Sequence, residues 1–100
     1  MSWTERDKRL VWNNATIVTH EEKDIWRKEA CGAWISWNQF GNRDSEYGWE
    51  IDHITAVANG GGNELNNLQA LYWKNNEFKA DKTTTRYCVV TAKGTRNQGV

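Results

Sequence analysis

One stretch in the middle of this 100-residue chain constrains its fold more than any other part. An acid and a histidine, Asp52 and His53, stand side by side within an apolar run, and glycines follow at 60–62. A second apolar run and a polar segment of helical composition carry the chain from Leu65 to Lys79. Aromatic and β-branched runs bounded by glycine and asparagine indicate strands. The stretch therefore predicts a strand, a loop, a second strand and a helix.

Local patterns predict the remaining elements. Thr4 is a suitable cap for a helix over residues 5–14, and the Ser/Thr-x-x-Glu pattern at Thr19 predicts a second helix that ends near Ala30. Strands are expected over 33–37, 47–58, 68–73 and 86–92, and a last helix over 74–82. We expect the strand over 47–58 to run antiparallel to the one over 33–37, and the tail after Lys93 to be mobile.

Length and composition agree with one small α+β domain. A chain of 100 residues is one domain's worth, and a domain this small buries a limited share of its surface. Each of the seven tryptophans can bury on the order of 200 Å². We therefore expect the tryptophans to fill the core, with a platform that stacks nucleobases as the alternative.

Charge is unevenly distributed, although the formal net charge is +0. Residues 41–73 carry a net charge of −4, and residues 74–100 carry a net charge of +4. The neutral total argues against binding of polyanions through bulk charge. An acidic centre beside a basic end nevertheless suits a cation site next to a phosphate-binding surface, with random scatter as the alternative.

Two cysteines, Cys31 and Cys88, lie far apart and form no Cys-x-x-Cys pair. Their number excludes a four-cysteine zinc site and a disulfide scaffold, and we expect two reduced, buried thiols. No apolar run approaches the ~18 residues of a membrane span, and the N-terminus has no signal-peptide pattern. These features predict a soluble, intracellular protein.

The polar residues of the central stretch match the needs of phosphodiester hydrolysis. This reaction needs a base that takes a proton from water, and a divalent cation that neutralises charge on the phosphate and the leaving oxygen. Imidazole suits the first task, and carboxylate and amide oxygens suit the second because Mg²⁺ prefers hard oxygen ligands. His53, Asp52 and Asn76 supply this set if the last helix turns Asn76 back toward the strand.

Asp52 and His53 pose a geometric problem, because neighbours in a regular strand point to opposite faces of a sheet. The two side chains can share one site only if the strand ends, twists strongly or bulges at that point. We therefore predict irregular backbone geometry directly after His53.

The same residues resemble the motif of the HNH endonucleases, whose ββα-metal fold is shared by colicin nucleases, homing endonucleases and the HNH domains of CRISPR effectors. The matching segments are Trp49–Ile54, Gly60–Gly61, Leu65–Gln69 and Asn75–Lys79, with Cys31–Ile35 and Tyr47–Trp49 upstream. The resemblance implies a single nuclease domain over 1–100, with the core motif over 47–82. Around that ββα-metal core it implies an N-terminal helical extension and a small antiparallel sheet.

The resemblance also implies a role for each residue of the motif. Asp52 and Asn76 would hold one divalent metal ion, Mg²⁺ in the first place and Mn²⁺, Ni²⁺ or Zn²⁺ as alternatives. His53 would be the general base, its ring oriented by a backbone carbonyl, and Asn67 would tie down the loop and position the histidine. The products would be a 5′-phosphate and a 3′-hydroxyl. The residues expected to contact nucleic acid are Lys74, Lys79, Lys82 and Arg86.

The expected partner is double-stranded DNA, and no association with a membrane is expected. The choice between monomer and homodimer stays open. The resemblance places the protein in the bacterial cytoplasm, encoded by a bacterium or a phage. Two positions depart from the family's pattern: Ala56 stands where proline is common, and Tyr72 stands where histidine is common. The chain also lacks the cysteine pairs with which many relatives bind a structural zinc.

Two other classes of protein stay open. One is a DNA-binding module that does not cut, or a component of a larger nucleic-acid-processing complex, and the other is a small structural metal protein. Each residue also has a purely structural alternative. These are Asp52 as an acid paired with a basic neighbour, His53 as a packed strand histidine, Asn67 as a turn residue, Asn76 as a helix cap, and Lys79 and Lys82 as solvated surface. The intact combination of Asp52, His53 and Asn76 favours the nuclease.

Overall fold

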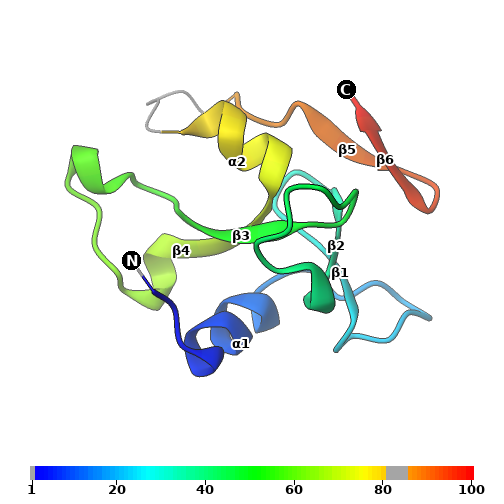
Figure 1. The fold of residues 1–100 in the computed structure, drawn as a ribbon, viewed down its shortest axis with the longest axis horizontal. Coiled ribbons are helices and arrows are strands. Elements are labelled where there is room, and N and C mark those ends of the chain that lie inside the picture. Colours follow the sequence, from blue (N-terminus) through cyan, green and yellow to red (C-terminus); the bar gives the residue numbers. More distant parts are fainter. Residues whose placement is uncertain (1, 81–85) are drawn as a thin grey trace.

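The computed structural model describes residues 2–80 and 86–100, and it has the predicted α+β architecture (Figure 1). Its helices and strands are α1 (Glu5–Asn13), β1 (Trp26–Lys28), β2 (Trp34–Ser36), β3 (Trp49–His53), β4 (Leu68–Tyr72), α2 (Trp73–Lys79), β5 (Val90–Lys93) and β6 (Arg96–Gly99). Short 3₁₀ turns lie at Trp37–Gln39, Val57–Asn59 and Leu65–Asn67. Within these residues, no helix is both long and apolar enough to cross a bilayer.

The described strands pair into three antiparallel two-stranded sheets, β1 with β2, β3 with β4, and β5 with β6. In the central sheet Trp49 lies opposite Tyr72, and His53 lies opposite Leu68. Helix α2 begins where β4 ends and packs against both strands of this sheet, while α1 packs against β4 (Figure 1). The central sheet therefore lies between the two helices.

Helix α1 begins where its cap predicts. Thr4 Oγ1 accepts a hydrogen bond from the Asp7 N–H at 3.0 Å, and the Asp7 carboxylate accepts one from the Thr4 N–H at 3.0 Å. Both bonds use N–H groups that the first turn of a helix leaves unpaired. The helix buries Val11 and Trp12 against the central sheet, so its prediction from sequence is confirmed to within one residue.

The expected second helix, from Thr19 to about Ala30, is wrong. His20 has a φ of +75°, a left-handed conformation that the first turn of a helix starting at Thr19 cannot contain. The chain then makes a single turn at Glu22 and extends into β1, which pairs with β2. Pairing across this hairpin buries Trp34 and Ile35, so tertiary packing overrides the local helix signal.

Four further expectations need correction. Strand β3 stops at His53 rather than near Ala58, and its partner is β4 rather than the strand over 33–37. The last predicted strand begins four residues later than expected, at Val90. The tail after Lys93 is not free, because β6 returns along β5 and the side chain of Asn97 bonds the backbone of Trp34 and of Glu46.

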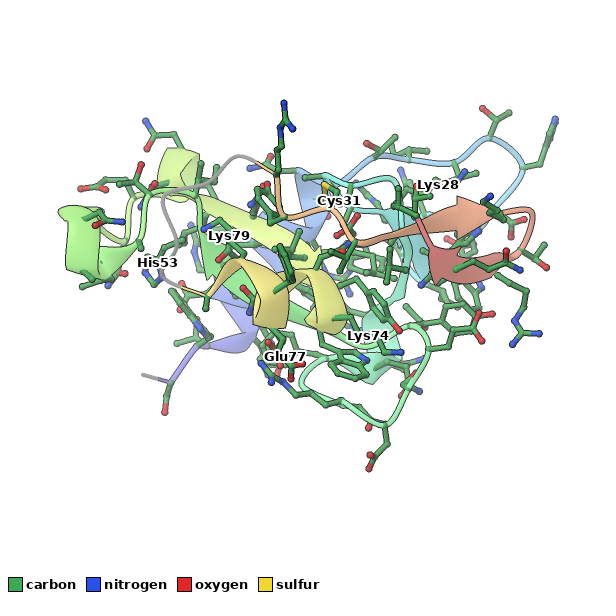
Figure 2. All side chains as sticks on the ribbon, turned by 90° about the horizontal axis from the view of Figure 1, so that it is seen from above. Lys28, Cys31, His53, Lys74, Glu77 and Lys79 are labelled. Carbon is green, nitrogen blue, oxygen red and sulfur yellow. A yellow bond between two sulfur atoms is a disulfide. The ribbon has the colours of Figure 1, made fainter. Side chains whose placement is uncertain are left out.

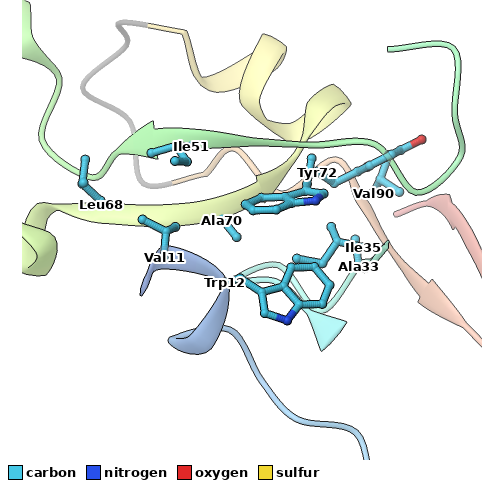
Figure 3. Close-up of a cluster of buried hydrophobic side chains, with 10 residues drawn as sticks. Val11, Trp12, Ala33, Ile35, Ile51, Leu68, Ala70, Tyr72 and Val90 are labelled. Carbon is cyan, nitrogen blue, oxygen red and sulfur yellow. The ribbon is translucent and has the colours of Figure 1, made fainter. Parts of the chain in front are cut away.

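The core lies between α1 and the central sheet and combines aliphatic side chains with the buried rings of Trp12, Trp49 and Tyr72 (Figure 3). Trp12 and Trp49 are fully buried, and their ring centroids are 5.3 Å apart. Trp37 meets Trp12 edge to face at 5.6 Å, a favoured arrangement of aromatic rings. The prediction that tryptophans fill the core is confirmed for most of them. The tryptophans that are buried or packed against the core are Trp3, Trp12, Trp34, Trp37, Trp49 and Trp73.

A buried carboxylate connects the hairpin β1–β2 to the segment from β4 to β5. Glu29 is 3% exposed and accepts four hydrogen bonds of 2.7–3.3 Å. The donors are the backbone N–H groups of Cys31, Ala33 and Tyr72 and the side-chain amide of Asn75. Burial raises the pKa of Glu29 above its ordinary value, and these hydrogen bonds only partly oppose the shift. Asn75 extends the network by bonding the backbone of Val90.

The expectation of two reduced thiols is also wrong, because Cys31 and Cys88 form a disulfide with their Cα atoms 5.3 Å apart. The bond joins the β1–β2 turn to the segment that enters β5. Two cysteines 57 residues apart carry no sequence signal of proximity. The disulfide is a covalent tie between these two distant parts of the chain.

We predict that reduction of this disulfide lowers the free energy of unfolding by about 2–4 kcal/mol, because the cross-link restricts the unfolded chain. Urea unfolding followed by tryptophan fluorescence, with and without dithiothreitol, measures the change. The double variant Cys31→Ser, Cys88→Ser serves as the control and should match the reduced protein in both conditions. Equal stability of the reduced and oxidised protein would contradict the prediction.

Candidate active site

Asp52 and His53 occupy the last two positions of β3, where strand pairing stops. After His53 the Ile54 N–H still bonds the Asn67 carbonyl at 2.7 Å, and the chain then bends into the 3₁₀ turn at Val57–Asn59. The predicted irregularity after His53 is therefore confirmed. Both side chains line an open cavity of about 540 Å³, together with Asn76 from α2.

The imidazole of His53 has two neighbours that hold it. Its Nε2 lies 2.7 Å from Oδ1 of Asn63, and its ring centroid lies 5.8 Å from that of Trp3. An amide oxygen can only accept a hydrogen bond, so in the neutral ring the tautomer that fits this contact has its proton on Nε2 and its lone pair on Nδ1. The resemblance implied that a backbone carbonyl bonds the His53 ring, whereas in the structure the side chain of Asn63 does so.

Asn67 holds together the loop that connects β3 to β4. Its Oδ1 accepts from the Thr55 N–H at 2.8 Å, and its Nδ2 donates to the carbonyls of Thr55 and Gly62 at 3.1 and 2.8 Å. Gly61 belongs to this arrangement, because a Cβ atom there would collide with the Thr55 carbonyl oxygen. Asn67 thus lies outside the cavity and acts on the backbone that follows His53.

Asp52 is buried, with 6% of its surface exposed, and carries an internal counter-ion. Gln69 Nε2 donates to its Oδ2 at 2.9 Å, and Lys79 Nζ lies 3.3 Å from its carboxylate. Lys79 also donates to the His53 carbonyl at 2.8 Å and is itself only 4% exposed; both residues are labelled in Figure 2. The expectation that Lys79 contacts phosphate is therefore corrected: its ammonium is held in the interior between Asp52 and the end of β3.

Asn76 does reach back to β3, but its bond is to Glu50 rather than to Asp52. Asn76 Nδ2 donates to Glu50 Oε1 at 2.8 Å, and Arg43 binds the same carboxylate through two bonds of 2.7 and 2.9 Å. Burial by itself raises the pKa of Glu50, but the bonds from Arg43 and Asn76 outweigh it and lower the pKa. A carboxylate only accepts hydrogen bonds, so the Asn76 amide turns its nitrogen to Glu50. Its Oδ1 is then the atom that could bind a metal ion.

Of the other residues expected to contact nucleic acid, the described ones, Lys74 and Arg86, do not line this cavity. Lys74 is exposed on α2, with its Nζ 5.4 Å from the Trp73 ring centroid. Arg86 is exposed at the start of the segment that leads to β5. Lys82 lies outside the described residues. Farther along the basic end, Arg96 forms an ion pair with Glu46 at 2.8 Å.

Sequence reasoning missed four residues around the site: Trp3, Arg43, Glu50 and Asn63. Asn63 directly follows the glycine run, and Glu50 stands two residues before Asp52 and so faces the same side of β3. That alternation was the one available signal for Glu50. Trp3 and Arg43 reach the site only through the fold. Among the described residues, no group of three or more histidine, cysteine or acidic side chains forms a metal cluster.

The sequence model of the HNH endonuclease family matches residues 31–82 of this chain. The match spans more than half of the 100 residues and includes β3, β4 and α2, so the protein belongs to the HNH endonuclease family. Membership indicates a nuclease that acts on DNA. The chain has no match among curated proteins or among solved structures.

We predict that Lys79→Met destabilises the fold by about 3 kcal/mol, because it leaves the Asp52 carboxylate buried without its counter-ion. Urea unfolding at neutral pH measures the loss. Lys74→Met removes the same side chain from an exposed position of the same helix and should change stability by less than about 0.5 kcal/mol. Equal effects of the two substitutions would show that the Asp52–Lys79 pair does not hold β3 to α2.

Proposed function

We propose that this protein is a metal-dependent DNA endonuclease in which His53 activates the attacking water. One observation carries the proposal: Asp52, His53 and Asn76 come from two elements and line one cavity. The hairpin β3–β4 followed by α2 is then the ββα-metal core of the family, and α1 is its N-terminal extension. The loop held by Asn67 fixes the backbone that follows the histidine.

His53 has the chemistry of a general base in this arrangement. With Nε2–H bonded to Asn63, the lone pair of Nδ1 is available to take a proton from water. The bond to Asn63 also stabilises the positive charge that the ring acquires, because an amide oxygen accepts more strongly from imidazolium. Trp3 limits rotation of the ring by packing against it. These contacts support a role for Asn63 and Trp3 in positioning His53.

The donors that face the cavity fit a hard divalent cation. Asp52 offers carboxylate oxygens with lone pairs beyond those used by Gln69 and Lys79, and the Asn76 amide is turned so that Oδ1 is its ligand atom. Asp52 and Asn76 would hold the ion, with Mg²⁺ as the expected species and Mn²⁺, Ni²⁺ or Zn²⁺ as alternatives. When bound, the cation would neutralise charge on the phosphate and on the leaving 3′-oxygen, so that cleavage leaves a 5′-phosphate.

Lys79 acts at a distance from the phosphate in this proposal. Its ammonium keeps the Asp52 carboxylate in place and fixes the His53 carbonyl, so it positions both functional residues. Contacts with the DNA backbone fall instead to exposed cations. Lys74 and Arg86 are the candidates in the described residues, and Lys82 stays a candidate from sequence. Such contacts would make DNA binding weaken as salt concentration rises.

A second function has one observation in its favour. Lys79 lies near both oxygens of the Asp52 carboxylate, which is the arrangement expected of a structural ion pair. If Asp52 stays paired with Lys79, it does not bind the metal ion that cleavage needs. The protein would then bind DNA without cutting it, alone or within a larger complex. The two functions differ in whether DNA is cleaved when metal is supplied.

We predict that the protein nicks supercoiled plasmid with Mg²⁺ or Mn²⁺ and that EDTA abolishes the reaction. His53→Ala should lower the rate by at least about 100-fold, since general base catalysis contributes about 10²–10⁴-fold. His20→Ala is the matched control, because His20 is exposed and does not line the cavity, and it should cut at the rate of the unaltered protein. Salt-sensitive DNA binding without nicking would support the second function instead.

We also predict that Asp52→Ala and Asn76→Ala each weaken Mn²⁺ binding by at least ~10-fold in isothermal titration calorimetry, because each removes an oxygen ligand. Asn66→Ala removes an exposed amide outside the cavity and should leave the affinity unchanged. Circular dichroism of each variant checks that the fold persists. Unchanged affinity in a folded Asn76→Ala variant would rule out Asn76 as a ligand.

A further inference from the structure

A second cavity lies away from the candidate active site and is lined mainly by aromatic rings. Its volume is about 220 Å³, and its walls are Trp26, Trp34 and Tyr47, with Glu21 and Thr95 completing the lining. It shares no lining residue with the cavity of Asp52 and His53. Nothing in the proposed nuclease mechanism uses this cavity.

The ring of Trp26 is nearly perpendicular to each of the other two rings. Trp26 stands at 89° to Tyr47 with centroids 5.0 Å apart, and at 87° to Trp34 with centroids 6.2 Å apart. Two of the walls are anchored to the β5–β6 turn: Trp34 Nε1 donates to the Gly94 carbonyl at 2.7 Å, and the Tyr47 hydroxyl donates to the Thr95 carbonyl at 3.1 Å. The walls are therefore preorganised by bonds to a distant part of the chain.

The charge of the lining selects the kind of ligand. Among the described residues that line it, Glu21 is the one carboxylate, and none is a lysine or an arginine. Faces of aromatic rings carry negative electrostatic potential and attract cations. Trp34 already shows this property, because the ammonium of Lys28 lies 4.8 Å from its ring centroid. Aromatic walls and a carboxylate together favour a positively charged group and oppose a phosphate.

We propose that this aromatic cavity binds a quaternary or methylated ammonium group. Methyl groups on the nitrogen spread its charge and reduce the hydration of the ammonium group. The group can therefore enter a cavity whose walls offer few hydrogen-bond acceptors. The volume lies below the ~300–1,000 Å³ of sites for drug-sized ligands, which suits a single compact head group rather than a whole nucleotide. Trp26, Trp34 and Tyr47 form the cage, and Glu21 supplies the opposite charge.

Choline is the probe that tests the proposal, and its neutral isostere, in which a tert-butyl group replaces trimethylammonium, is the control ligand. We expect choline to shift the indole N–H signals of Trp26 and Trp34 in NMR spectra of the oxidised protein. The dissociation constant should be on the order of millimolar, because cation–π contacts are individually weak. The isostere should bind at least about fivefold more weakly. Equal binding of the two ligands, or no shift with choline, would overturn the proposal.

Variants locate the site and separate it from the nuclease. Tyr47→Leu should weaken choline binding at least about fivefold, whereas Tyr47→Phe keeps the ring face and should stay within about twofold. Glu21→Gln alters one exposed side chain and should weaken binding by about threefold without changing plasmid nicking. A Tyr47→Leu variant that stays folded and binds choline unchanged would overturn the assignment. Shifts with a nucleoside and none with choline would identify a base-binding pocket instead.

Discussion

The buried ion pair between Asp52 and Lys79 joins the strand that ends at the site to the helix that supplies Asn76. Two charges withdrawn from water cost several kcal/mol in desolvation, and the pair is tolerated because each group is also hydrogen-bonded. Gln69 satisfies the carboxylate, and the His53 carbonyl satisfies the ammonium. Since Lys79 bonds the peptide at the point where β3 stops pairing, the same contact sets how His53 leaves the strand. The relative placement of Asp52, His53 and Asn76 therefore depends on this internal ion pair.

Internal pairing also accounts for part of the charge asymmetry of the chain. The acidic centre and the basic end lie against each other in the fold, through Asp52 with Lys79 and Glu46 with Arg96. Two cations that the sequence offers to a phosphate surface are thus committed to carboxylates of the same chain. The unpaired positive charge at this end is correspondingly smaller than the net charge of residues 74–100 indicates. These internal ion pairs are compatible with a metal site in the cavity, because Asp52 and Asn76 still line it.

Predictions from sequence succeeded where a few neighbouring residues decide the outcome. Thr4 and Asp7 cap α1 through contacts three residues apart. The irregular backbone after His53 was predicted from the adjacent Asp52 and His53, although the strand itself was expected to continue to Ala58. The predictions failed where distant segments decide. The capping pattern at Thr19 competes with strand pairing between β1 and β2, and pairing wins because it buries Trp34 and Ile35. The disulfide between Cys31 and Cys88 has the same origin, since only folding brings the two cysteines together.

The sequence by itself determined the chemical groups of the candidate site, their order along the chain and the strand, loop, strand and helix that carry them. Those features depend on residue type and on short-range spacing, which are local properties of a polypeptide. Only the tertiary structure decided that Asn63 bonds His53, that Asn76 bonds Glu50 and that Lys79 is internal. These contacts join residues 10 to 26 positions apart, and their partners are selected by packing of the hydrophobic core rather than by any local pattern.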